Sequence, residues 1–127
     1  MIKNYSEGYE KYSLFGVDHN CIMAHCVYNN IDEIKLLKNN NIYVAHCPES
    51  NLNITSGIAP ISKYLDMDIN VGLGSDVSGG SSLSLLRAAR QAIQVSKMYY
   101  RYIDEKARIL TTKDAFYMAT LGGGKFF

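Results

Sequence analysis

The sequence lacks any long apolar run and any large excess of charge of one sign. No stretch approaches the roughly 20 apolar residues of a membrane-spanning helix, and residues 1–16 lack the apolar core of a secretory signal peptide. The formal net charge of +1 provides no long-range attraction to nucleic acid or to anionic membranes. Because 47% of the 127 residues are hydrophobic and 20% are charged, we expect a cytoplasmic globular protein that binds neither.

Cysteine is scarce, and its spacing excludes the common paired motifs. Cys21, Cys26 and Cys47 are an odd number of thiols, and none belongs to a C-x-x-C pair. We therefore expect free, reduced thiols, as is usual in the cytoplasm. A zinc site made of these thiols with His25 and His46 is a weaker alternative, because structural zinc sites usually have tightly paired ligands.

Short apolar stretches alternate with amphipathic ones along the whole chain. This alternation is typical of right-handed βαβ units and a parallel sheet, so we predict an α/β fold. The predicted strands are residues 21–25, 42–46 and 68–73, the predicted helices are residues 31–38, 58–65, 83–100 and a last helix from Thr111 or Thr112 to the glycines at 122–124, and residues 49–57 are predicted as a loop.

Three strands are too few for a closed barrel of parallel strands. A (β/α)8 barrel typically has about 250 residues, and an exposed edge of a parallel sheet leaves backbone groups unpaired. We therefore expect residues 1–127 to be one partial barrel domain, truncated at both ends.

Three polar side chains stand where the predicted strands end. His25 ends the first strand, His46 ends the second, and Asp76 follows the third within the segment GLGSDV. A single histidine beside an apolar strand is more often a packing residue. In a parallel barrel, however, all strands open toward the same mouth, so the repeated placement favours a catalytic or metal-binding site.

The segments around these residues resemble a known family. They are MAHCVYNNIDEI at 23–34, VAHCPESNLNITSGIAPI at 44–61, VGLGSDVSGGSSLSLLRAAR at 71–90 and ATLGGGKFF at 119–127. In these segments the chain resembles the amidohydrolase superfamily and, within it, the guanine deaminases and related chlorohydrolases. The resemblance implies that the three strands are the sixth, seventh and eighth of a metal-dependent hydrolase TIM barrel. It also implies zinc-dependent conversion of guanine and water to xanthine and ammonia, a step of purine catabolism.

The resemblance implies a role for each candidate residue. Asp76 matches the metal-binding aspartate, which also transfers a proton, and His25 matches a catalytic or orienting histidine that is not itself a ligand. His46 and Asn51 are predicted on the substrate side. A structural role is an equal alternative for His46, and Asn51 could instead satisfy loop backbone.

The chain also departs from the family pattern. It contains no H-x-H pair and no fifth-strand histidine followed by glutamate, so Asp76 is its single expected metal ligand. Catalytic zinc normally has three protein ligands, and we therefore expect the isolated chain to be inactive. Two alternatives remain open: a related amidohydrolase acting on another aminated heterocycle, and a non-catalytic half-barrel that forms a homodimer or requires a complementary fragment.

Overall fold

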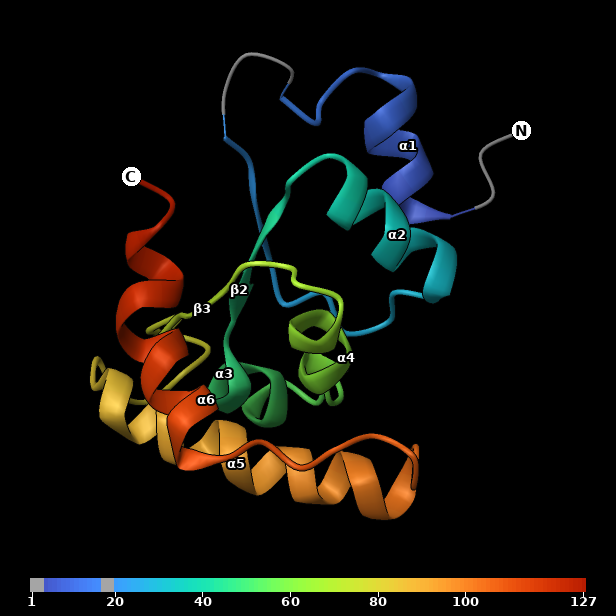
Figure 1. Ribbon diagram of the computed structural model, residues 1–127. Helices are drawn as coiled ribbons and strands as arrows, with labels where there is room; N and C mark the ends of the chain where they lie inside the picture. Colours follow the sequence, from blue (N-terminus) through green and yellow to red (C-terminus); the bar gives the residue numbers. More distant parts are fainter. Residues whose placement is uncertain (1–3, 17–19) are drawn as a thin grey trace.

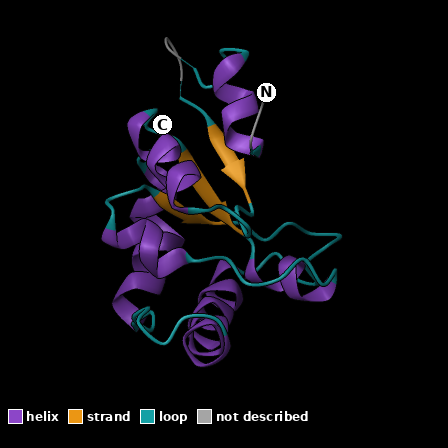
Figure 2. Cartoon of the chain, turned by 90° about the vertical axis from the view of Figure 1, so that its right-hand side faces the viewer, coloured by secondary structure: helices purple, strands orange, loops and turns teal. Residues whose placement is uncertain are grey.

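The computed structural model describes residues 4–16 and 20–127, and in these residues three strands form one parallel sheet. The strands lie in sequential order, and Figure 2 shows them side by side. Met23 is in register with Val44, and Ala45 is in register with Gly72. The predicted α/β fold with parallel strands is thus confirmed. The strands are β1 (Ile22–Ala24), β2 (Tyr43–His46) and β3 (Val71–Leu73).

Helical segments connect the strands, and their first residues follow capping rules. Asn30 and Glu33 form a reciprocal capping box at the first connecting helix. Thr111 accepts a hydrogen bond from the backbone N–H of Asp114, which confirms the predicted hydroxyl cap. The helices are α1 (Tyr5–Lys11), α2 (Ile31–Asn39), α3 (Pro48–Asn53), α4 (Ile61–Asp66), α5 (Leu85–Tyr102), α6 (Thr112–Tyr117) and the π-helical η1 (Met118–Gly122).

Helix α3 corrects one prediction. Residues 49–57 were expected to form a loop, but α3 begins immediately after β2. Pro48 ends the strand because it has no N–H to donate, and the same residue suits the first turn of a helix, where that N–H would be unpaired anyway. Figure 1 shows α5 passing beneath α3, at the end of β2 from which α3 starts.

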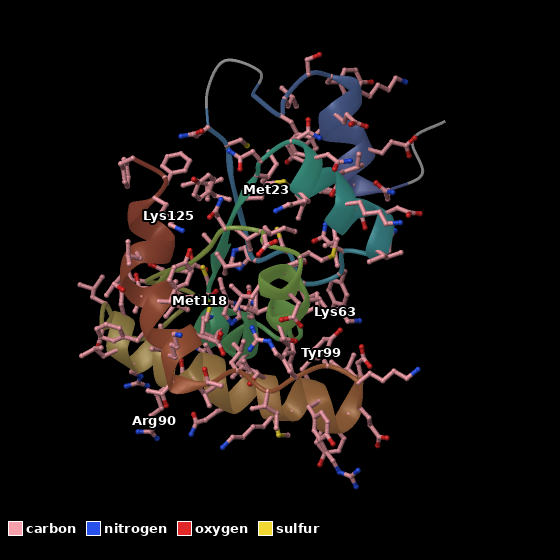
Figure 3. The ribbon with its side chains drawn as sticks, viewed as in Figure 1. Met23, Lys63, Arg90, Tyr99, Met118 and Lys125 are labelled. Atoms are coloured by element: carbon pink, nitrogen blue, oxygen red, sulfur yellow. The ribbon has the colours of Figure 1, made fainter. Side chains whose placement is uncertain are left out.

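The core lies between the sheet and the surrounding helices. Val44 and Val71 supply its strand side, while Leu37 and Tyr64 project from α2 and α4, all of them almost completely buried. Met118, labelled in Figure 3, joins this cluster from η1. No helix of the described residues is both long and apolar enough to cross a lipid bilayer.

The glycine run near the carboxyl end does more than stop a helix. Helical backbone continues through Gly124 instead of ending where the run begins. A Cβ atom at Gly122 would overlap the carbonyl oxygen of Val71, so only glycine permits η1 to approach β3 this closely. The run therefore brings the last helical segment directly against the sheet.

Candidate active site

Two of the three polar residues at the strand exits meet in the structure. His25 directly follows β1, and Asp76 is the third residue after β3. The Nε2 atom of His25 lies 3.8 Å from Oδ2 of Asp76. Their side chains are 38% and 42% exposed, so both remain accessible to a small molecule. The expected convergence at the carboxyl ends of the strands therefore holds for this pair.

Both residues have backbone conformations that side chains seldom adopt. The φ angles are 67° at His25, 46° at Cys26 and 44° at Asp76, all in the left-handed region. The backbone N–H groups of Gly79 and Gly80 donate to the carbonyl of Asp76, and the hydroxyl of Tyr64 donates to the carbonyl of Cys26. Such conformations persist only where surrounding contacts hold them, and they cluster at functional sites.

Helix α3 contacts each member of the pair with one of two successive residues. The hydroxyl of Ser50 donates to Oδ2 of Asp76 over 2.5 Å. The neighbouring Asn51 places its Oδ1 atom 2.7 Å from Nδ1 of His25. Both α3 side chains are buried. Sequence reasoning did not identify Ser50, and recognising Pro48 as a helix start would have placed it on the first turn after β2.

A second group of contacts attaches the loop after β3 to α3. The buried carboxylate of Glu49 accepts hydrogen bonds from Ser81 and Arg87, and the Arg87 contact is 2.8 Å long. The Ser81 hydroxyl and then the Arg87 charge lower the pKa of Glu49. The amide of Asn53 donates to the carbonyl of Gly79 over 2.8 Å. These contacts hold the segment that carries Asp76.

His46 is buried and makes no hydrogen bond to His25 or Asp76. Its side chain is 1% exposed and lines a small cavity with Ala92, Val95 and Tyr99 of α5. Neither ring nitrogen has a hydrogen-bond partner among the described residues. Burial, with a smaller contribution from His25, lowers the pKa of His46 to about 3. This geometry favours the structural alternative for His46, and substrate contact remains a prediction.

Asn51 is also buried, and its side chain faces His25. The contact that the structure shows is with His25, and the side chain is only 2% exposed. Substrate contact by Asn51 therefore also remains a prediction.

The thiols show no sign of the alternative zinc site. Cys21, Cys26 and Cys47 are free, and burial raises the pKa of Cys26 to about 12 and that of Cys47 to about 11. Zinc binds the deprotonated thiolate. Within residues 4–16 and 20–127, no group of three or more histidine, cysteine, aspartate or glutamate side chains is arranged to hold a metal ion.

Comparisons with known proteins place this arrangement in context. The chain is 38% identical over 124 residues to guanine deaminase of Dictyostelium discoideum, and the match covers 98% of this chain and 27% of that protein. The crystal structure of guanine deaminase from C. acetobutylicum with bound guanine is 46% identical, with a TM-score of 0.90, over 98% of this chain and 29% of the other.

One less similar protein was solved with a bound metal ion. Atrazine chlorohydrolase from Arthrobacter aurescens TC1, solved in complex with zinc, is 30% identical, with a TM-score of 0.68, over 83% of this chain and 23% of the other. The chain thus spans about a quarter of the length of the guanine deaminases that it matches. Because the sequence model of the amidohydrolase family matches residues 1–127 throughout, the chain belongs to the amidohydrolase family.

Proposed function

We propose that this chain forms the sixth to eighth strands of a guanine deaminase barrel, in which His25 and Asp76 face the substrate. The complete barrel converts guanine and water to xanthine and ammonia. The observation that carries the proposal is the 3.8 Å approach of His25 to Asp76 at the strand exits, in a chain 46% identical to a guanine deaminase that binds guanine.

The sheet edges support the barrel assignment of residues 1–127. Among the described residues, β1 and β3 each pair only with β2, which leaves the outer edge of each strand unpaired. Further strands pairing there would satisfy these backbone groups, as closure of a barrel does. A strand from a complementary fragment, or from a second copy of the chain, would pair at these same edges of β1 and β3.

We also propose a cytoplasmic location, because all three cysteines are free thiols.

The chain's own residues suit the proton transfers of a hydrolytic deamination. A carboxylate oxygen of Asp76 accepts a proton from the attacking water and returns it to the exocyclic amine of guanine. The C–O bond forms first and gives a tetrahedral carbon, and the C–N bond then breaks as the protonated amine leaves as ammonia. The second water proton moves to the neighbouring ring nitrogen as the carbonyl of xanthine forms. His25 orients the water by accepting a hydrogen bond at Nε2.

Asp76 also fits the role of a metal ligand. The Ser50 hydroxyl occupies Oδ2, while Oδ1 makes no hydrogen bond to the described residues. A partly exposed carboxylate with one free oxygen is a suitable zinc ligand. Bound zinc would supply an attacking water of lowered pKa. The remaining ligands would come from the rest of the barrel, because the described residues contain no complete ligand cluster.

A chimera provides the test. The chain replaces the matching segment of the C. acetobutylicum guanine deaminase, and ammonia release from guanine is measured. We expect Asp76→Asn to reduce turnover by about 100-fold or more, because it removes a proton acceptor. The matched control is Asp68→Asn, since Asp68 also has a positive φ but precedes β3. Turnover that survives Asp76→Asn would contradict the proposal, as would robust turnover by the isolated chain.

A second candidate is a related hydrolase that acts on another aminated or chlorinated heterocycle. The 30% identity to atrazine chlorohydrolase favours this alternative. Presenting the chimera with guanine, an adenosine derivative and a triazine separates the two, because the preferred substrate has the highest kcat/KM.

A further inference from the structure

The hydrogen bond between Asn51 and His25 determines which histidine nitrogen carries the proton. We propose that Asn51 is a positioning residue that holds His25 as the Nδ1–H tautomer and so presents the lone pair of Nε2 toward Asp76. This inference rests on the proposed function and deepens it, because it assigns the hydrogen-bonding direction of His25 during catalysis.

The donor and acceptor chemistry carries the first step. Oδ1 of Asn51 lies 2.7 Å from Nδ1 of His25, and a carboxamide oxygen can only accept a hydrogen bond. Nδ1 must therefore carry a proton. In a neutral imidazole the other nitrogen, Nε2, is then an acceptor.

The second step concerns Asp76, the other group near the ring. Its Oδ2 atom is 3.8 Å from Nε2, which is too long for a direct hydrogen bond. Oδ2 already accepts the hydroxyl proton of Ser50. Asp76 therefore makes no direct hydrogen bond to Nε2, and Asn51 is the one described side chain with a direct hydrogen bond to the ring.

The third step is the rigidity of Asn51. Its side chain is 2% exposed, its backbone N–H donates to Cys47, and its carbonyl accepts from Ser56. These bonds fix the backbone of Asn51, and in its buried side chain Oδ1 faces the ring while Nδ2 has no hydrogen-bond partner among the described residues. His25 is 38% exposed, so the opposite nitrogen remains open to a water molecule or substrate group.

The consequence is a division of roles between the two residues. Nε2 of His25 accepts a hydrogen bond from the attacking water, while the Asp76 carboxylate accepts its proton. In the opposite tautomer Nε2 would donate, and the water would lose one of its two acceptors. Asn51 thus acts through His25 instead of by touching the substrate.

Nitrogen-15 NMR of the histidine-labelled chain, at a pH where the imidazoles are neutral, reads the tautomer directly. The His25 signal is assigned by its loss in His25→Gln. We expect a protonated Nδ1 and an unprotonated Nε2 in the parent chain, a shift toward Nε2–H in Asn51→Leu, and recovery in Asn51→Asp, which restores the acceptor. The matched control is Asn40→Leu, which leaves the tautomer unchanged because the Asn40 amide donates to the carbonyl of Leu36 within α2.

Kinetics of the chimera separate positioning from substrate contact. We expect Asn51→Leu to lower kcat about 10- to 100-fold with little change in KM, and Asn51→Asp to recover much of that loss. A raised KM with unchanged kcat would overturn the proposal, as would a predominant Nε2–H signal in the folded parent chain. The NMR measurement requires no turnover, so the tautomer and the guanine deaminase activity can fail independently.

Discussion

Replacing His46 by leucine should remove a large part of the acid sensitivity of this fold. The imidazole is buried against α5, and burial lowers its pKa from 6.5 to about 3. The folded chain therefore keeps His46 neutral, whereas the unfolded chain binds a proton below pH 6.5. The stabilising effect of neutral burial is fully present above pH 6.5 and is lost as the pH falls toward 3.

The size of the effect follows from the same pKa difference. Each pH unit in this window costs about 1.4 kcal/mol of unfolding free energy. Between pH 7 and pH 4.5, titration of His46 should therefore lower the unfolding free energy of the parent chain by about 2.5 kcal/mol. Urea unfolding of the parent and His46→Leu at both pH values measures this loss, and carboxylates common to both proteins cancel in the comparison.

The leucine variant also makes a prediction at neutral pH. Because both ring nitrogens of His46 lack partners among the described residues, an apolar replacement should leave the free energy of unfolding at pH 7 unchanged or raise it. If both proteins lose the same free energy between pH 7 and pH 4.5, then His46 is not held neutral by burial, and the reasoning is refuted.

Three further predictions concern the surroundings of the site. Tyr64→Phe should lower the free energy of unfolding by about 1–3 kcal/mol in urea titrations, because the buried carbonyl of Cys26 loses its donor; an unchanged midpoint would contradict this. Iodoacetamide should modify Cys26 and Cys47 far more slowly in the native than in the urea-unfolded chain, since burial raises both pKa values, and equal rates by mass spectrometry would exclude it. Gly79→Ala should lower the free energy of unfolding by about 1–3 kcal/mol, because the added methyl would overlap the buried hydroxyl of Ser50. Gly124→Ala, where the methyl has open space, should leave the melting temperature unchanged. Thermal melts of both variants measure the difference.

Contacts near the carboxyl end of α5 join segments that are distant in sequence. Lys63 of α4 and Tyr99 of α5 lie beside one another in Figure 3, with Nζ 5.9 Å from the ring centroid. The same ammonium lies 2.8 Å from the carboxylate of Asp104. The alternating pattern predicts both helices, but it cannot predict that this ion pair joins α4 to the segment that follows α5, because Lys63 and Asp104 are far apart in sequence.

Local patterns predicted the order of strands and helices well. Apolar stretches and caps act within a few residues, so the first connecting helix was predicted from Ile31 to within one residue of its end at Asn39. The third strand was predicted too long. Asp68 has a φ of 53°, so the chain still turns there and pairs only from Val71.

The burial of His46 could have been predicted from the sequence. In a strand, alternate residues share a face, so His46 lies on the same face as Val44. Both are buried, whereas Tyr43 and Ala45 of the same strand are partly exposed. His25 does not follow this alternation, because it lies after the end of β1 and has a left-handed backbone conformation. Two histidines in similar motifs therefore point to different surroundings.

The sequence by itself determined the α/β order and the position of His25, His46 and Asp76 at the strand exits, because strand periodicity and turn chemistry are local. Only the tertiary structure decided which of them meet. The approach of His25 to Asp76 depends on two left-handed backbone positions and on α3, which binds both side chains through Ser50 and Asn51. These contacts join residues about 26 positions apart, and such pairing is specified by packing in three dimensions and by no local pattern.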